Sequence, residues 1–190
     1  MDILIVLAHP DPRSFNSVLA DAAAEALRRA GRAAEICDLY ADGFDPVLPL
    51  EDLRRRASFE ARSAGYAEAL RAASGLLVIH PDWWGLPPAI LKGWVDRVFL
   101  PGLAYAYEAD GRPGPDTAPL PLLAGRRALV AVTRDGQAVG FSAPFWGRLF
   151  DTCGIEPYET LDIGPLRGLG GLEKSKLIEK NAAAMAAWFV

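Results

Sequence analysis

The sequence predicts an α/β protein in which a parallel β-sheet is covered by helices on both faces. Three short apolar runs, at 3–8, 76–79 and 128–132, are continuous rather than alternating, as strands buried on both faces are. Segments with the 3.6-residue period of amphipathic helices separate these runs. Strands and helices therefore alternate along all 190 residues, which predicts one doubly wound domain at 1–190.

The first helix follows the strand at 3–8. We expect Asn16 to be its N-cap, because asparagine side chains accept hydrogen bonds from the free N–H groups of a helix start. Its apolar stripe runs from Val18 to Ala30, and Gly31 is expected to end it. Two weaker elements are expected next, a strand at 33–38 and a helix at 59–73.

The helix after 76–79 is expected to begin near Pro88, with an apolar stripe from Ile90 to Phe99 and with Lys92 and Asp96 paired on its polar side. The remaining elements expected are an excursion rich in proline and glycine at 101–126, a strand at 128–132, a helix near 145–153, a strand at 158–163 and a closing helix with a stripe from Leu177 to Phe189. Five strands favour the sheet order 2-1-3-4-5 over the six-stranded dinucleotide-binding fold.

Composition excludes several classes of protein. The formal net charge is 20 − 24 = −4, which argues against a nucleic-acid binder of the basic-patch kind. Cys37 and Cys153 lie far apart, so neither a disulfide framework nor a structural zinc site is expected. No basic segment precedes the apolar run at 3–8, and no apolar stretch approaches the ~20 residues that cross a bilayer. We therefore expect a cytoplasmic protein without a metal.

Ligands of open α/β sheets bind at the carboxyl ends of the strands, and the loop after the first strand has the residues for an anion site there. Ser14, Asn16 and the free N–H groups of the helix start suit a phosphate, and Arg13 could add a positive charge. The alternative is that Ser14 and Asn16 only cap the helix. The glycine-rich dinucleotide fingerprint is absent.

Two further loops are expected at the same edge of the sheet. The loop that follows 76–79 carries adjacent tryptophans, Trp83 and Trp84, which favour a wall for a flat aromatic ligand, although one of them could belong to the core. The loop from Thr133 to Gly136 offers a hydroxyl, backbone N–H groups and a guanidinium for the polar edge of a heterocycle. The alternative is an ordinary turn with a surface arginine.

Two motifs extend this interpretation to a family. AHPDPRSFN at 8–16 and the pattern W-x-x-x-PAILKGW-x-[DE]-RVF at 84–99 resemble the flavodoxin-like NAD(P)H:quinone oxidoreductases, which include the DT-diaphorase type and bacterial enzymes associated with potassium efflux. The likeness covers nearly the whole chain. It implies a flavodoxin-like three-layer sandwich around a five-stranded parallel sheet in the order 2-1-3-4-5.

The resemblance also implies roles for individual residues. His9, Phe15 and Asn16, with Ser14 beside them, match positions that contact the phosphate and ribityl chain of a flavin. The positions that match the border of the flavin ring are Pro81, Asp82, Trp83, Trp84 and Gly85, with Trp84 as the matching aromatic. The positions that match the loop at the pyrimidine edge are Thr133, Arg134, Asp135 and Gly136. For His9, a packing role is the alternative.

The chain departs from the family pattern at several of these positions. Trp83 stands where the family commonly has Gln or Tyr, and Asp82 where it has an apolar residue. Arg134 and Asp135 replace a small neutral pair. Phe141 falls at the position of a tyrosine that the DT-diaphorase type places near the hydride acceptor.

The implied activity is a flavin-dependent NAD(P)H oxidoreductase. FAD or FMN would be the cofactor, NADPH or NADH the co-substrate, and a quinone or similar electron-poor molecule the acceptor in a ping-pong hydride mechanism. Backbone N–H groups of 134–136 and the charge of Arg134 are expected to stabilise the reduced ring. The alternatives are a regulatory subunit of a potassium-efflux transporter and a flavodoxin-type electron carrier. A homodimer is expected, since in this family the flavin lies near a two-fold interface.

Overall fold

The computed structural model describes residues 2–107, 118–136 and 142–190. Its five main strands are β1 (Ile3–Leu7), β2 (Ala34–Asp38), β3 (Gly75–Pro81), β6 (Arg127–Thr133) and β7 (Tyr158–Ile163). The helices are α1 (Phe15–Arg29), α2 (Leu50–Arg55), α3 (Ala61–Ala72), α4 (Ala89–Val98), α5 (Ser142–Cys153) and α6 (Gly171–Trp188). Two short strands, β4 (Tyr105–Ala106) and β5 (Leu120–Pro121), pair with each other outside the main sheet.

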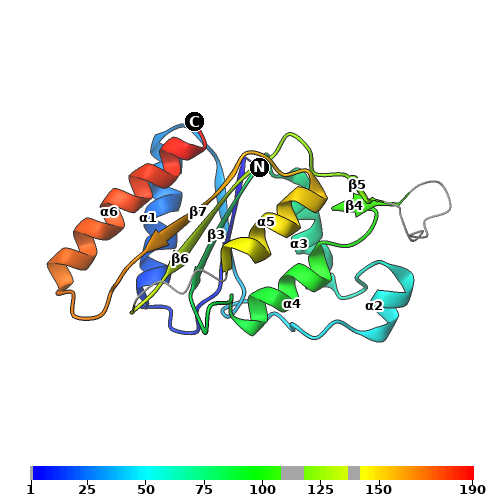
Figure 1. The fold of residues 1–190 in the computed structure, drawn as a ribbon, viewed down its shortest axis with the longest axis horizontal. Coiled ribbons are helices and arrows are strands. Elements are labelled where there is room, and N and C mark those ends of the chain that lie inside the picture. The colour runs from blue at the N-terminus through cyan, green and yellow to red at the C-terminus, as the bar shows by residue number, and fades with distance from the viewer. Residues whose placement is uncertain (1, 108–117, 137–141) are drawn as a thin grey trace.

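The main sheet is parallel, with the order β2-β1-β3-β6-β7. This confirms the predicted order of five strands, because β4 and β5 belong to the excursion after α4. Helices cover both faces, α1 and α6 on one and α3, α4 and α5 on the other (Figure 1). Alternate residues of β1 serve the two cores, so that Ile5 faces α1 and α6 while Val6 faces the opposite layer. The strand ends of β1, β3, β6 and β7 therefore meet at one edge.

The start of α1 differs from the expectation. Its N-cap is Ser14, whose side chain accepts a hydrogen bond from the backbone N–H of Ser17, whereas Asn16 is buried inside the first turn. Val18, expected on the apolar stripe, is 45% exposed. The buried face begins with the polar side chains of Asn16 and Ser17, so the predicted apolar stripe missed this first turn and wrongly included Val18. Gly31 has φ +77° and ends the helix region as expected.

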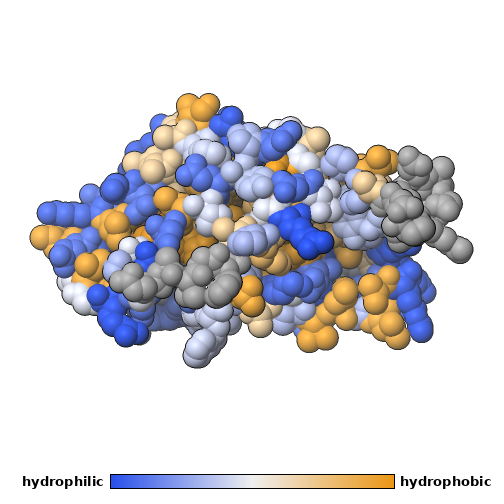
Figure 2. Space-filling model, viewed as in Figure 1, coloured by the Kyte–Doolittle hydropathy of each residue, from blue (hydrophilic) through white to orange (hydrophobic). Residues whose placement is uncertain are grey.

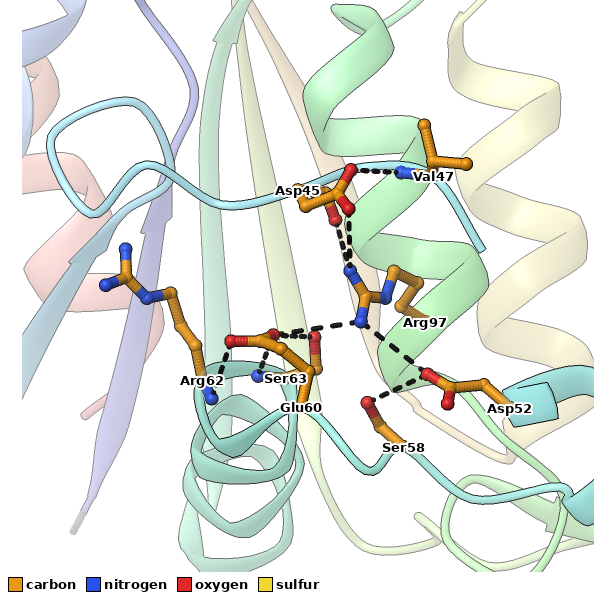
Figure 3. Close-up of polar contacts among 8 residues, drawn as sticks. All are labelled: Asp45, Val47, Asp52, Ser58, Glu60, Arg62, Ser63 and Arg97. Carbon is orange, nitrogen blue, oxygen red and sulfur yellow. Dashed lines mark hydrogen bonds and ion pairs between the residues drawn. The ribbon is translucent and has the colours of Figure 1, made fainter. Parts of the chain in front are cut away.

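A connection absent from the prediction, 42–60 with α2, is held against α4 by Arg97 (Figure 3). Arg97 is 1% exposed, and its guanidinium donates to the Asp45 carbonyl at 2.6 Å. It also lies 3.6 Å from the Asp52 carboxylate and 3.7 Å from that of Glu60. A Cβ at Gly93 of α4 would lie 2.3 Å from Pro46, so this close approach needs glycine.

None of the helices among the described residues combines the length and the apolar character that crossing a membrane requires.

Candidate functional site

The loops that follow β1, β3, β6 and β7 enclose a pocket of about 300 Å³ at the carboxyl edge of the sheet. This is the edge where open α/β sheets bind ligands. Its lining residues are His9, Ser14, Phe15, Asn16, Pro81, Asp82, Trp83, Thr133, Arg134, Asp135, Leu166 and Lys174. Three segments that lie far apart in the sequence, and that sequence analysis singled out separately, thus form one concave site.

Ser14 both caps α1 and lines the pocket. Its Oγ accepts from the Ser17 N–H at 3.1 Å and lies 2.9 Å from the Ser17 hydroxyl, which donates to the Asp11 carbonyl at 3.0 Å. These bonds fix the turn before α1, so that the first N–H groups of the helix are held at the pocket rim. The two interpretations of Ser14, helix cap and ligand contact, are therefore compatible.

A buried hydrogen bond joins α1 to β6 beneath the pocket. The hydroxyl of Thr133 donates to Oδ1 of Asn16 at 2.9 Å, and both residues are at least 97% buried. Because Oδ1 is engaged in this way, the amide group of Asn16 keeps its N–H donors for a ligand in the pocket. Two residues of different predicted loops therefore act as one polar unit.

The loop after β3 is a tight turn with unusual backbone. Trp83 and Leu86 exchange backbone hydrogen bonds at 3.1 and 3.2 Å, and the two central residues, Trp84 and Gly85, have φ +60° and +81°. Two positive φ values in sequence define a type I′ turn, which is uncommon for a bulky residue such as tryptophan. The Asp82 carboxylate accepts from the Gly85 N–H at 2.6 Å and stabilises this turn.

The turn separates the two tryptophans. Trp83 is 41% exposed and lines the pocket, with its ring 6.3 Å from that of His9. Trp84 is fully exposed and lies outside the lining. Trp83, and not the Trp84 that the resemblance favoured, is therefore the aromatic wall of the pocket in this structure.

Arg134 lines the pocket from the loop after β6. Its guanidinium lies 2.6 Å from the Asp162 carboxylate of β7 and also donates to the Gly136 carbonyl. A Cβ at Gly164 would lie 2.6 Å from the Arg134 carbonyl oxygen, so glycine is needed for this close contact. The Asp162 pairing offsets much of the charge that Arg134 was expected to direct at a ligand.

Most of the predicted site residues line this pocket, and three do not: Trp84, Gly85 and Gly136. Phe141 lies outside the described residues. Two lining residues were not predicted, Leu166 and Lys174, which reach the pocket from the segment after β7 and from the first turn of α6. Residues near the pocket could have been expected in that segment, because it follows the fifth strand of the same sheet.

Comparison with known proteins places these features in a family. A family model described as flavodoxin-like fold matches residues 1–189. NAD(P)H dehydrogenase (quinone) 1 from Cavia porcellus is 34% identical over 195 residues, with 85% of this chain and 68% of the relative covered.

Two solved structures are also similar. The crystal structure of Smu.1420 from Streptococcus mutans UA159 has a TM-score of 0.83 at 29% identity, with 98% of this chain and all of that chain covered. An FMN-dependent NADH-azoreductase from Bacillus anthracis, solved in complex with FMN, shares the fold at 17% identity with a TM-score of 0.72, covering 98% or more of both chains. The chain therefore belongs to the flavodoxin-like family of NAD(P)H:quinone oxidoreductases, a family of oxidoreductase enzymes.

Proposed function

We propose that the chain is a flavin-dependent NAD(P)H oxidoreductase that passes two electrons to a quinone or a similar electron-poor acceptor. The observation that carries the proposal is the pocket itself. It combines an aromatic wall, a buried amide donor, a helix start and two cationic side chains at the carboxyl edge of a doubly wound sheet.

The residues present fit a flavin. The α1 start, with Ser14, Asn16 and the pocket residue Lys174, suits the phosphate end, since helix N–H groups and an ammonium favour an anion. Trp83 and Pro81 suit the flat ring, and the loop from Thr133 to Asp135 suits its polar edge. When bound, a flavin supplies hydride chemistry that protein side chains cannot.

The chain's own groups would position and polarise the bound ring. The Thr133–Asn16 bond holds the Asn16 amide in one orientation, with its N–H donors left for a ligand, and preorganised donors lose little free energy in reorganising during reaction. Arg134 adds a guanidinium that Asp162 holds in one place. We propose that the nicotinamide and the acceptor use the same open side of the pocket in turn, beside Trp83.

The first experiment identifies what binds. Purified protein is heated, and the released chromophore is characterised by absorbance and mass; protein that arrives colourless is titrated with FMN and FAD. The proposal predicts one of these flavins, followed by oxidation of NADPH or NADH with menadione as the acceptor and without a partner reductase. Protein that carries no flavin and takes up neither would overturn the proposal. Flavin binding without turnover would favour the carrier or regulatory alternative.

The proposal includes a homodimer. Four apolar side chains around α2 are more than half exposed, and we call them the α2 patch: Val47, Leu50, Leu53 and Phe59. Figure 2 shows apolar atoms gathered at the lower right of the molecule, where Figure 1 places α2. Apolar surface of this kind is typical of a contact with another protein molecule.

A further inference from the structure

A buried imidazole lies directly beneath the pocket. His80 is fully buried and immediately precedes the pocket residue Pro81 at the end of β3. Its Nε2 atom lies 3.2 Å from the indole Nε1 of Trp146, a residue of α5 that is also fully buried. Its Nδ1 atom lies 2.8 Å from the Pro81 carbonyl oxygen.

These contacts determine where the proton of the imidazole resides. An indole N–H can only donate, so Nε2 of His80 must accept and carries no proton. The proton is therefore on Nδ1, which donates to the Pro81 carbonyl. Burial lowers the pKa of His80 to about 4, which keeps this neutral form at neutral pH.

The residues that follow β1 explain why the carbonyl of Pro81 has no backbone hydrogen-bond donor on that side. The Ala8 N–H donates to the Ile79 carbonyl at 3.1 Å, and hydrogen bonds in a parallel ladder recur every two residues. The next bond would join the nitrogen of residue 10 to the Pro81 carbonyl, but Pro10 has no N–H. His80 thus supplies the hydrogen-bond donor that Pro10 cannot supply.

The same polar path continues across the pocket floor. The Asp82 N–H donates to the Thr133 carbonyl at 2.7 Å, and the Thr133 hydroxyl donates to Asn16. Polar contacts therefore run from α5 on one face of the sheet to α1 on the other, through the segment 80–82.

We infer that His80 is a positioning residue which, together with Trp146, holds the Pro81–Asp82 segment in the geometry that the planar ligand of the pocket requires. The inference rests on the proposed function, because the planar ligand is the flavin ring. His80 acts through Pro81 and is not assigned any contact with the ligand.

Substitutions of His80 and Trp146 distinguish this positioning role from a contribution of the two rings to core packing alone. His80→Phe together with Trp146→Phe replaces both polar partners by apolar rings, leaving only the Pro81 carbonyl without its donor. Trp94→Phe is the matched control, because Trp94 is fully buried and its indole nitrogen makes no hydrogen bond to any residue that the structure describes. Affinities for FMN and FAD are measured by flavin fluorescence, and folding by circular dichroism and thermal unfolding.

We expect the double variant to fold and to bind the preferred flavin at least ten times more weakly than the wild type, with an altered visible spectrum of the bound flavin. Trp94→Phe is expected to lower the melting temperature and to leave flavin affinity within twofold. Wild-type affinity and spectrum in the folded double variant would overturn the inference. If the double variant does not fold, Trp146→Phe alone is compared with Trp94→Phe by the same criteria.

A second readout needs no flavin. The ring ¹⁵N shifts of His80 in the ligand-free protein report the tautomer, and we expect a protonated Nδ1 and an unprotonated Nε2. The opposite tautomer would overturn the inference even if flavin binds. A wild-type protein that binds no flavin, but shows the expected tautomer, would instead contradict the proposed function.

Discussion

Lys174 brings a positive charge to the pocket that has no carboxylate partner among the described residues. Arg134, the cation that sequence analysis selected, is paired with Asp162 instead. An ammonium that has no carboxylate partner among the described residues and a helix start, both lining one pocket, suit a phosphate group.

Replacing Lys174 by Met should therefore weaken binding of FMN roughly 10- to 150-fold, because a hydrogen bond to a charged group is worth about 1.5–3 kcal/mol. Riboflavin, which lacks the phosphate, should bind both proteins equally. Flavin titrations give both affinities, and Lys176→Met, two residues further along α6, is the control. Equal losses for FMN and riboflavin would contradict a phosphate contact.

His80 makes stability depend on pH with a definite sign. In the unfolded chain its pKa is about 6.5, whereas in the folded protein it is about 4. Between these values the unfolded state binds a proton that the folded state does not, so stability is lost as the pH falls. Urea unfolding should show that the wild type loses about 2 kcal/mol more between pH 7 and pH 5 than the His80→Phe, Trp146→Phe variant does. Parallel losses would show that His80 does not cause this dependence.

The elements of the sheet could be predicted because each strand is an uninterrupted apolar run or is flanked by clear turns. The strand predicted at 158–163 coincides with β7. The connection with α2 could not be predicted, because its place is set by Arg97, which lies 97 − 55 = 42 positions beyond the end of α2 and is buried through tertiary contacts. The helix has six residues and only two leucines, Leu50 and Leu53, both exposed, so its apolar pattern is too short to mark it.

We expect Arg97 to be required for holding residues 42–60 against α4. Arg97→Met leaves the buried Asp52 carboxylate without its cation, and removing one partner of a buried pair costs roughly 3–5 kcal/mol. Urea unfolding measures the loss. Lys92→Met, which breaks the exposed pair with Asp96 on the same helix, is the control and should change stability by less than about 1 kcal/mol. Equal effects would show that the Arg97 cluster contributes no more than a surface ion pair.

For the molecule as a whole, the pocket could be located from sequence because Asn16 follows β1, and Pro81 and Thr133 end β3 and β6, whose carboxyl ends meet at one edge. The directions in which the side chains point could not be predicted. Trp83 and Trp84 differ in exposure because of the φ values of one turn, and Lys174 lies in a helix whose other lysines, Lys176 and Lys180, give it no distinguishing pattern.

The proposed homodimer predicts a molar mass of roughly 41 kDa in solution, twice the 20.5 kDa of the chain. Size-exclusion chromatography with light scattering measures it. Leu53→Glu places a charge in the α2 patch and should shift the mass towards the monomer. Leu172→Glu, on the exposed side of α6, is the matched control and should leave the mass unchanged. A monomeric wild type would exclude the dimer.

The turn that carries Trp84 also gives the protein a built-in fluorescent probe of the surface at this turn. A fully hydrated indole emits at longer wavelength than the indoles of Trp94 and Trp146, which are shielded from water. Any molecule that stacks on this turn, whether a small aromatic compound or a second polypeptide, should quench the red component of tryptophan emission or shift it to the blue. Contacts made at this turn can therefore be followed in the unlabelled protein.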